Sequence, residues 1–592
     1  MQRHMSFDTV LIANRGEIAL RVMRACKELG LRTVAVYSEA DRDSLHVRYA
    51  DDAFLIGPPP AVQSYLQTET ILDVARRSGA GAIHPGYGFL SENTDFVRTC
   101  DAAGIAFIGP TADAMDLMGG KIHARQVALR AHVPLVPGTT EAVESVAEAL
   151  ELGEQYGYPI AIKASAGGGG RGLKVAYQPE EVEFAFESAR REAEAAFKNG
   201  ELFVEKYVLD PRHIEIQILA DQYGNVVYLG ERDCSVQRRH QKLIEETPSP
   251  AVSPELRRTM GECALRLCRE TSYVGAGTLE FLLAPDGQFY FLEMNTRIQV
   301  EHTVTEMVTG IDLVQAQLRI AQGEKLWFTQ EEIQLRGHAI QCRINAEDAA
   351  AGFRPALGTI SAYNEPKGYG VRVDAGVEQG TTIPPYYDSM LAKLVTWGAT
   401  RGEALQRMRR ALNDYTIEGI TTVIPFHKLA LAEPAFEHGD VTVSFIPRYL
   451  EAKLKQLPSA TPSTTEPAAE QPSRELMVEV NGRRFAVRVA GEGLNTPIAS
   501  NKAAAPTRHR AANKKREVAT DPNAVICPIQ GTIVAIKTSV GAAVEAGQVV
   551  FVVEAMKMEN EIATPRAGTI ATINAEVGKS IEAGSVLATL EA

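Results

Sequence analysis

Residues 277–301 read GTLEFLLAPDGQFYFLEMNTRIQVE, and this stretch predicts a β-hairpin with a carboxylate on each strand. Two apolar runs flank residues 285–287, Pro-Asp-Gly, which is a typical turn sequence. If Asp286-Gly287 forms a two-residue loop, Glu280 lies directly opposite Glu293. Like charges that face each other across a hairpin repel and destabilise it.

A divalent cation between the two carboxylates would turn this repulsion into attraction. The alternative is a pair of solvent-exposed carboxylates, which is disfavoured because three phenylalanines give the hairpin a core-like composition. We therefore expect Glu280 and Glu293 to bind Mg²⁺ or Mn²⁺ beside nucleotide phosphates. Asn295 is two residues further on, and should face the same side.

Three polar residues follow this strand in alternation, Arg297, Gln299 and Glu301. If the strand continues, they point one way into the same site. An anion held by Arg297 and deprotonated by Glu301 would then lie against the terminal phosphate. His240 and Lys242 add positive charge, although nothing local places them there.

A second phosphate-binding element is the glycine-rich stretch at 166–172, AGGGGRG. It lies between two predicted strands, 160–164 and 173–177, and the first of them carries Lys163. The stretch lacks the Lys-Ser/Thr ending of a Walker A loop. It is either a plain flexible loop or, as we favour, a flap whose backbone amides cover a phosphate chain.

Composition excludes several classes of protein. The chain has 592 residues, about four domains, and a net charge of -13, which argues against general nucleic-acid binding. No apolar run approaches the ~20 residues of a membrane helix, and the first residues lack the apolar core of a secretory signal. Seven scattered cysteines fit reduced thiols, so we expect a cytoplasmic multidomain protein.

The chain divides at two linker-like stretches, 458–473 and 501–523. The second is basic, and is either a docking site for an acidic partner or, as we favour, a solvated tether. Between them, residues 475–489 predict a hairpin around Asn481-Gly482. The N-terminal body opens with alternating strands and helices, which predicts a parallel doubly wound layer, and lacks the glycine fingerprint of a nicotinamide site.

The C-terminal segment is an internal repeat. Gly531-Thr532-Ile533 recurs 37 residues later as Gly568-Thr569-Ile570. Two β-rich halves of this size predict a small sandwich with quasi-two-fold symmetry. Lys557 lies at the junction of the halves, on a predicted tight turn and between two methionines.

These motifs resemble a known family. The sequence around Lys557, AMKM, resembles the attachment site of a biotinyl carrier domain. Residues 12–19 (IANRGEIA), 84–93 (HPGYGFLSEN) and 293–302 (EMNTRIQVEH) resemble the biotin carboxylase component of biotin-dependent carboxylases, an ATP-grasp enzyme. The combination is similar to the α subunit of an acyl-CoA carboxylase.

The resemblance implies an α/β multidomain fold. It consists of a Rossmann-like N-terminal domain (1–117), an ATP-grasp domain with a glycine-rich lid (118–334) and a biotin carboxylase C-terminal domain (335–447). Linkers with a short β subunit-docking segment (448–523) and an all-β biotinyl barrel-sandwich domain (524–592) follow.

The resemblance also implies the site residues. The implied cofactor-binding residues are Lys121, Lys163, Gly168, Gly169, Gly170, Glu205, Lys206, Tyr207, Val208, His213, Gln237, His240, Gln299 and Val300. Glu280, Glu293 and Asn295 are the implied metal ligands, and Lys557 the biotinylated lysine. The implied catalytic groups are Lys242, Arg297, Glu301 and Arg343. Of these, Glu301 is the implied general base, and Arg343 the residue that stabilises the biotin enolate.

The implied reaction is phosphorylation of bicarbonate by ATP and carboxylation of biotin on Lys557. The implied partners are a biotin protein ligase and a carboxyltransferase β subunit in a hetero-oligomer, with an acyl-CoA as acceptor. The alternatives are a two-subunit carboxylase with another acceptor, such as pyruvate, another kind of ATP-grasp ligase, and a carrier with an inactive ATP site. A single-chain carboxylase is not expected, because no residues remain for a carboxyltransferase domain.

The sequence departs from the family pattern at Gln341, where many members have Glu beside the cysteine. Residues 353–358 and 527–531 also depart from the usual motifs. None of these positions is a proposed chemical group, so the departures bear on packing.

Overall fold

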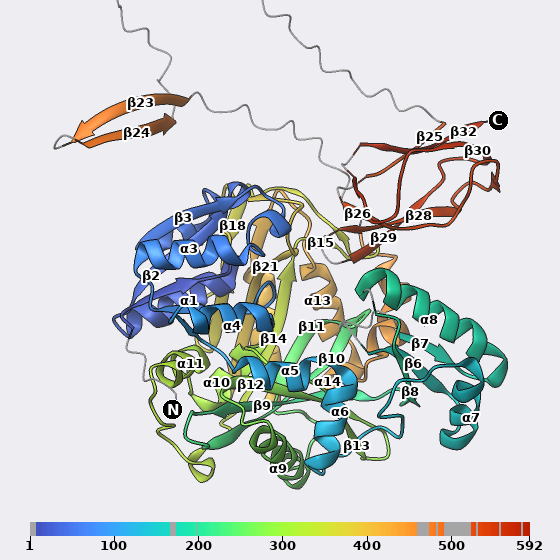
Figure 1. Ribbon diagram of the computed structural model, residues 1–592, viewed down its shortest axis with the longest axis horizontal. Helices are drawn as coiled ribbons and strands as arrows, with labels where there is room; N and C mark the ends of the chain where they lie inside the picture. Colours follow the sequence, from blue (N-terminus) through green and yellow to red (C-terminus); the bar gives the residue numbers. More distant parts are fainter. Residues whose placement is uncertain are drawn as a thin grey trace, which may run out of the picture.

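The computed structural model describes residues 7–165, 173–197, 199–458, 473–480, 483–490, 523–528, 531–555, 558–581 and 584–591 (Figure 1). Within these ranges, none of the helices combines the length and the apolar composition needed to cross a bilayer. All seven cysteines fall in the described ranges and are buried thiols.

The N-terminal sheet is parallel, with strand order β3-β2-β1-β4-β5. Its strands are β1 (Thr9–Ile12), β2 (Arg32–Ser38), β3 (Asp52–Gly57), β4 (Ala82–His84) and β5 (Ala106–Phe107). The helices of this region are α1 (Gly16–Glu28), α2 (Leu45–Tyr49), α3 (Thr68–Ser78), α4 (Thr94–Ala102) and α5 (Ala112–Gly119). The predicted doubly wound layer is confirmed, and the strand order reverses between β1 and β4, where such sheets bind ligands.

A separate three-stranded sheet, in order β7-β6-β8, carries the predicted glycine stretch. It consists of β6 (Ile160–Ala164), β7 (Leu173–Ala176) and β8 (Leu202–Lys206), with helices α7 (Val146–Tyr156) and α8 (Val182–Phe197) packed on it (Figure 1). Lys163 pairs with Leu173 across β6 and β7. Both predicted strands are therefore confirmed, while residues 166–172, including Gly168, Gly169 and Gly170, lie outside the described residues.

The largest sheet has eight antiparallel strands in the order β13-β12-β9-β10-β11-β14-β21-β19. Its strands are β9 (Arg212–Ala220), β10 (Val226–Arg238), β11 (Gln241–Thr247), β12 (Gly275–Leu283), β13 (Phe289–Asn295), β14 (His338–Asn345), β19 (Val371–Ala375) and β21 (Met390–Gly398). The pairing of β11 with β14 joins the part of the chain before residue 334 to the part after it in one continuous ladder.

Helices cover this sheet, and short strands complete the body. The helices are α6 (Lys121–Arg130), α9 (Pro254–Glu270), α10 (His302–Thr309), α11 (Leu313–Ala321), α12 (Arg401–Asp414), α13 (Ile424–Leu431), α14 (Pro434–Glu437) and α15 (Glu451–Leu454). The short strands are β15 (Glu347–Asp348), β16 (Arg354–Pro355), β17 (Gly358–Thr359), β18 (Ala362–Asn364), β20 (Thr382–Ile383) and β22 (Thr416–Glu418).

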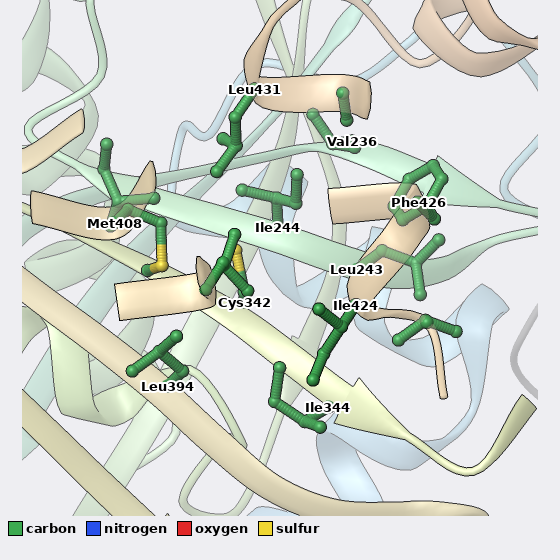
Figure 2. Close-up of a cluster of buried hydrophobic side chains, with 14 of the residues drawn as sticks. Val236, Leu243, Ile244, Cys342, Ile344, Leu394, Met408, Ile424, Phe426 and Leu431 are labelled. Atoms are coloured by element: carbon green, nitrogen blue, oxygen red, sulfur yellow. The ribbon is translucent and has the colours of Figure 1, made fainter. Parts of the chain in front are cut away.

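One face of the large sheet packs against α12 and α13 to form a hydrophobic core (Figure 2). Cys342 and Ile344 of β14 contribute to it, together with Met408 of α12 and Phe426 of α13. Because side chains alternate along a strand, the burial of Cys342 and Ile344 here directs Arg343 to the opposite face. The core thus fixes which β14 residues reach the site.

The C-terminal domain confirms the predicted repeat. Its strands are β25 (Ala524–Ile526), β26 (Gly531–Ile536), β27 (Ala543–Val544), β28 (Val549–Ala555), β29 (Met558–Ala563), β30 (Gly568–Ile573), β31 (Ser580–Ile581) and β32 (Val586–Glu591). They form two four-stranded sheets, β25-β32-β30-β27 and β29-β28-β26-β31, which are equivalent under a shift of one repeat.

Lys557 lies outside the described residues, so its placement on a turn stays a prediction. The strands before and after it are paired, with Ala555 opposite Met558. The other predicted hairpin is present as β23 (Ser473–Val480) and β24 (Arg483–Ala490), with Val480 opposite Arg483. Most of the two predicted linkers, namely residues 459–472 and 501–522, also lies outside the described residues.

Replacing Phe426 with alanine should destabilise the body by about 3–5 kcal/mol, because a fully buried ring is lost. This ring packs edge-on against Phe353, with 5.3 Å between the ring centroids. Denaturant unfolding followed by circular dichroism would measure the loss. The control is Phe184→Ala on α8, where the ring is 75% exposed and the change should stay within about 0.5 kcal/mol. Equal losses in the two variants would contradict the assignment of Phe426 to the core.

Candidate functional site

The opposed carboxylates predicted from the hairpin are present, but the predicted two-residue turn is wrong. Glu280 of β12 pairs directly with Glu293 of β13. Near the turn, however, Ala284 N donates to Gln288 O at 2.8 Å and closes a loop of three residues. An irregularity in β13 at Leu292 then shifts the register by one and restores the pairing. A β-bulge of this kind re-aims side chains and is common beside active sites.

Glu280 is buried and surrounded by cationic and amide donors. Lys242 Nζ donates to its carboxylate at 2.7 Å and Asn295 Nδ2 at 2.8 Å, and His213 Nε2 lies 3.2 Å away. Burial opposes ionisation of Glu280, but the charges of Lys242 and His213 hold its pKa well below its ordinary value. In the same way, burial opposes the protonation of His213, while Glu280 and Glu215 raise its pKa to about 9.

The surroundings of Glu293 differ from those of Glu280, the carboxylate opposite it. Among the described residues, no side chain donates a hydrogen bond to Glu293 or forms an ion pair with it. Its carboxylate lines the central cavity. Burial, and then the negative charge of Glu280, raise its pKa above the ordinary value. A cavity-facing carboxylate without a donor, opposite a second carboxylate, fits a divalent cation with oxygen ligands.

Lys242 is the centre of the buried charge cluster. Its ammonium contacts Glu215, Glu280 and Glu301, the last at 2.9 Å. Burial alone would lower its pKa, but the three carboxylates raise it well above the ordinary value. The sequence predicts only that Lys242 adds positive charge, without its place, and the structure brings it into contact with both Glu280 and Glu301.

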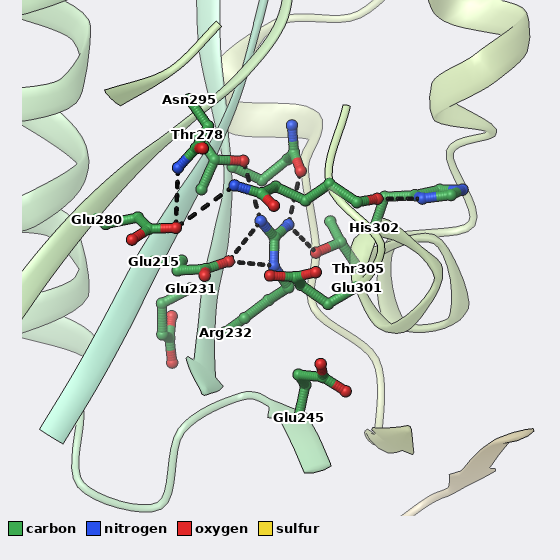
Figure 3. A network of polar contacts seen from close by, with 12 residues as sticks. Glu215, Glu231, Arg232, Glu245, Thr278, Glu280, Asn295, Glu301, His302 and Thr305 are labelled. Carbon is green, nitrogen blue, oxygen red and sulfur yellow. Dashed lines mark hydrogen bonds and ion pairs between the residues drawn. The ribbon is translucent and has the colours of Figure 1, made fainter. Parts of the chain in front are cut away.

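A fully buried arginine, Arg232, lies within this network of polar contacts (Figure 3). Arg232 donates to one oxygen of Glu215 through Nε at 3.0 Å and through Nη2 at 2.8 Å. It also donates to Gln217 at 2.6 Å and to Thr278 at 3.0 Å. Glu215 is thus paired with both Arg232 and Lys242, and the cation site at Glu280, Glu293 and Asn295 stays a prediction.

The prediction that Arg297, Gln299 and Glu301 lie on a continuing strand and point the same way is wrong. Strand β13 ends at Asn295, and Glu301 is the residue that caps the start of α10. The chain leaves the ladder after Asn295, where Glu92 of the N-terminal region accepts a hydrogen bond from Thr296 N at 3.0 Å. Arg297 and Gln299 line the cavity, whereas Glu301 lies beneath its surface and is fully buried.

Glu301 is held between two cations. Lys242 donates to one of its oxygens at 2.9 Å and Arg343 Nη2 to the other at 2.9 Å. Burial would raise the pKa of Glu301, but the charge of Lys242 lowers it below the ordinary value. Arg343 Nε also donates to Glu245 at 2.6 Å. Glu301 is therefore an ionised carboxylate, which is the state that a general base requires.

A second group of cations lies on and near the three-stranded sheet. Lys163 of β6 forms an ion pair with Glu205 of β8, and Arg125 Nη1 donates to the same carboxylate at 2.9 Å. Burial lowers the pKa of Lys121. The Lys206 ammonium instead donates to the carbonyls of Gly157 and Tyr158, both at 2.8 Å.

One cavity of about 870 Å³ joins these groups. The predicted site residues that line it are Lys121, Lys163, Glu205, Lys206, Tyr207, Val208, His213, Gln237, His240, Lys242, Glu280, Glu293, Asn295, Arg297, Gln299, Val300 and Arg343. The remaining predicted residues are Glu301, which lies under the lining, and Gly168, Gly169, Gly170 and Lys557, which are outside the described residues.

The sequence interpretation missed several residues of the cluster. Glu215 had a usable signal, because His213, Glu215 and Gln217 place polar groups at alternate positions of an apolar strand. Arg232, Glu245 and Glu92 had no comparable local signal. Glu92 comes from the N-terminal region and binds Arg297 Nε at 2.8 Å, a contact that only the tertiary fold reveals.

The cavity brings together the cations of the three-stranded sheet, the opposed carboxylates and the Lys242 charge cluster, an arrangement that fits a nucleotide-dependent ligase of the ATP-grasp class. Comparison with family models is consistent with this class. Residues 6–115 match "Biotin carboxylase, N-terminal domain", residues 120–329 "Carbamoyl-phosphate synthase L chain, ATP binding domain", residues 341–448 "Biotin carboxylase C-terminal domain", and residues 523–590 "Biotin-requiring enzyme".

Individual relatives agree. The chain is 51% identical over 454 residues to a pyruvate carboxylase subunit of Methanothermobacter thermautotrophicus, covering 76% of this chain and 92% of the relative. It is 47% identical over 560 residues to the biotin-dependent acyl-coenzyme A carboxylase alpha3 subunit of Mycobacterium leprae, covering 93% of both chains.

A solved structure is similar as well. The biotin carboxylase domain of Hydrogenobacter thermophilus 2-oxoglutarate carboxylase, solved with MgADP, ADP and bicarbonate, has a TM-score of 0.74 and 48% identity, over 76% of this chain and 99% of that one. The chain belongs to the biotin carboxylase family, with a biotin-requiring domain at its C-terminal end. It is an ATP-grasp ligase whose cofactors are those of the family, ATP with a divalent metal and biotin.

Replacing Glu293 with glutamine should abolish bicarbonate-dependent ATP cleavage and leave the ligand-free protein as stable as the parent, or more so. The change removes a predicted metal ligand and at the same time relieves the repulsion from Glu280. ADP release and thermal unfolding would be measured on the same samples. The control, Asp286→Asn, makes the same chemical change in the exposed loop of this hairpin and should keep activity within about twofold. Parental turnover in Glu293→Gln would overturn the metal assignment.

His213 should make the stability of the ligand-free protein depend on pH. Its pKa is raised from 6.5 to about 9, so its stabilising charge is fully present below pH 6.5 and is lost as the pH rises to 9. The loss should be about 3 kcal/mol at most. We expect His213→Gln to flatten this part of the stability profile, measured as Tm from pH 6 to 9.5.

The control is His427→Gln, because burial lowers the pKa of this equally buried histidine to about 4. It should keep the decline between pH 6.5 and 9. An unchanged decline in His213→Gln would show that another group is responsible.

Proposed function

We propose that the chain is the biotin carboxylase and carrier subunit of an acyl-CoA carboxylase, which passes carboxybiotin to a separate carboxyltransferase subunit. The observation that carries this proposal is the extent of the similarity to the acyl-coenzyme A carboxylase alpha3 subunit. That alignment covers 93% of both chains, so it includes linker and carrier regions as well as the catalytic body.

In this proposal, ATP lies along the cavity with its phosphates toward the cations of the three-stranded sheet. Lys163 and Lys121 bind phosphate oxygens, and the amides of Gly168, Gly169 and Gly170 cover them. The adenosine lies against residues 205–208, with His213, Gln237 and His240 around the ribose and phosphates. Lys163 is already paired with Glu205, so a bound phosphate chain competes for an ammonium that is held in position.

In this proposal, bicarbonate binds beside Arg297 and Lys242. Arg297, Gln299 and the backbone of Val300 hold the anion, and the charge of Lys242 attracts it. Arg297 is kept in place by Glu92 and by Asn295 Oδ1, to which it donates at 2.8 Å. When bound to Glu280, Glu293 and Asn295, a Mg²⁺ or Mn²⁺ ion would neutralise phosphate charge.

Glu301 takes the proton of bicarbonate in this proposal. Its carboxylate lies between Lys242 and Arg343, each 2.9 Å away. These cations favour its ionised form but also weaken it as a base. Low exposure strengthens every charge interaction in the cluster, because water does not screen it.

Arg343 acts on biotin. Its Nε and Nη2 are used by Glu245 and Glu301, whereas Nη1 has no hydrogen-bond acceptor among the described residues. Arg343 lines the cavity, so this free edge can bind the ureido oxygen of biotin as negative charge develops there. Lys557 carries the biotin, and its biotinylation requires a biotin protein ligase.

A second acceptor has support of its own. The pyruvate carboxylase relative from Methanothermobacter is 51% identical to this chain, which covers 92% of that relative. Pyruvate is therefore the alternative acceptor, and the carboxyltransferase partner decides between the two.

The deciding experiment combines the biotinylated chain with MgATP, labelled bicarbonate and a panel of acceptors, namely acetyl-CoA, propionyl-CoA, a long-chain acyl-CoA and pyruvate. The chain alone should label its own biotin and no acceptor. Addition of the carboxyltransferase that copurifies with it should move the label to an acyl-CoA. Lys557→Ala is the control, and should abolish labelling of the protein.

Transfer of label to pyruvate in the presence of the copurified carboxyltransferase would replace the acyl-CoA proposal by its alternative. Labelled acyl-CoA formed by the chain alone would contradict the need for a second subunit. Retained labelling in Lys557→Ala would contradict the biotinylation site.

A further inference from the structure

Gln341 is a buried neighbour of Glu245, the carboxylate that binds Arg343. It belongs to β14 and pairs across the ladder with Glu245 of β11. Both side chains are fully buried. Gln341 and Arg343 alternate with the core residues Cys342 and Ile344, so both face the charge cluster.

The side-chain amide of Gln341 accepts one hydrogen bond and donates another. Thr303 Oγ1 donates to Gln341 Oε1, and Gln341 Nε2 donates to Glu245 Oε2 at 3.0 Å. The other oxygen of Glu245 accepts from Arg343 Nε at 2.6 Å. Glu245 therefore has one donor for each oxygen, and the amide of Gln341 is one of the two.

We infer that Gln341 is a positioning residue for the biotin step, whose amide donor fixes Glu245 and, through Glu245, the guanidinium of Arg343. The inference rests on the proposed role of Arg343 toward biotin. Gln341 does not line the cavity, so it acts only through these contacts.

An amide and a carboxylate at this position differ in charge but hardly in shape. With glutamate at 341, two buried carboxylates would face each other across the ladder, and one of them would retain a proton up to a raised pKa. While protonated, that carboxyl group donates to its partner as the amide does. Once both are ionised, Glu245 loses a donor and gains a negative neighbour, so its contact with Arg343 is disturbed.

The surroundings make such a pair hard to ionise. Besides Gln341, the groups that interact with Glu245 include Arg343 on β14, Glu301 before α10, and the thiols of Cys234 on β10 and Cys342 on β14. Arg343 is the only cation in direct contact with Glu245 within the described part of the chain, and it is shared with Glu301. Burial raises the pKa of Glu245 even with a neutral neighbour. The amide at 341 therefore removes a proton-binding pair from the Arg343 side of the site.

The test uses the full biotinylated chain with glutamate or methionine at position 341. Bicarbonate-dependent ADP release reports the ATP step, and single-turnover labelling of protein-bound biotin reports the biotin step, both from pH 6.5 to 9. Gln341→Glu should lose biotin carboxylation relative to the parent by about threefold or more as the pH rises, and regain it at low pH. Gln341→Met cannot donate or bind a proton, so its deficit should be the same at every pH.

The matched control is Gln315→Glu. Gln315 also donates to a glutamate, Glu28 Oε2 at 2.7 Å, but on an exposed surface. It should leave both rates within about twofold of the parent at all pH values. ADP release should likewise stay within about twofold in both Gln341 variants, which separates positioning of Arg343 from general damage.

A flat ratio of Gln341→Glu to parent across the pH range, or a parallel loss of ADP release, would overturn the inference. Failure of the proposed function is distinguishable. A parent that forms no carboxybiotin removes the biotin step, and the inference falls with it, whereas transfer of carboxybiotin to pyruvate changes only the acceptor and leaves the inference intact. An active parent with a flat ratio overturns only the role of Gln341.

Discussion

The site depends on the burial of several carboxylates around a single ammonium. Glu215, Glu280 and Glu301 all contact Lys242, and an unpaired buried carboxylate is strongly disfavoured. The surrounding arginines therefore have a structural role, since Arg232 pairs with Glu215 and Arg343 with Glu301. The position of each charge is fixed by its neighbours, which is the preorganisation that stabilises developing charge in a reaction.

Much of the fold could be predicted from local sequence. Strands, the first helix, the hairpin at residue 481 and the C-terminal repeat all have short-range signals, namely periodicity, turn residues and self-similarity. The hairpin of β12 and β13 was predicted only in part. The pairing of Glu280 with Glu293 is right although the predicted two-residue loop is wrong, because the bulge at Leu292 compensates for a three-residue loop. The sequence has no signal that predicts this bulge.

The charge cluster was harder to predict, for a physical reason. Its members come from separate strands and from the N-terminal region, and they are brought together only by the order of strands in the sheet. Glu301 illustrates the difficulty. Its spacing from Arg297 suggested a continuing strand, but it enters the site from the start of α10. The role of Glu301 was predicted from that spacing as well as from family resemblance, and the place of Lys242 from resemblance alone, whereas Glu245 and Arg232 lacked both signals.

The continuous eight-stranded sheet limits how this protein can change in evolution. The hairpin with Glu280 and the strand with Arg343 belong to one hydrogen-bonded ladder, so the spacing between the two ends of the site is set by backbone pairing at about 4.8 Å per strand. A single inserted residue within β14 would exchange Arg343 with its core neighbours, because a slip of one position reverses the faces of a strand. Insertions and deletions are therefore confined to loops, and the interior can vary only by replacing one side chain with another of similar shape. A glutamine in place of a glutamate is a change of that permitted kind.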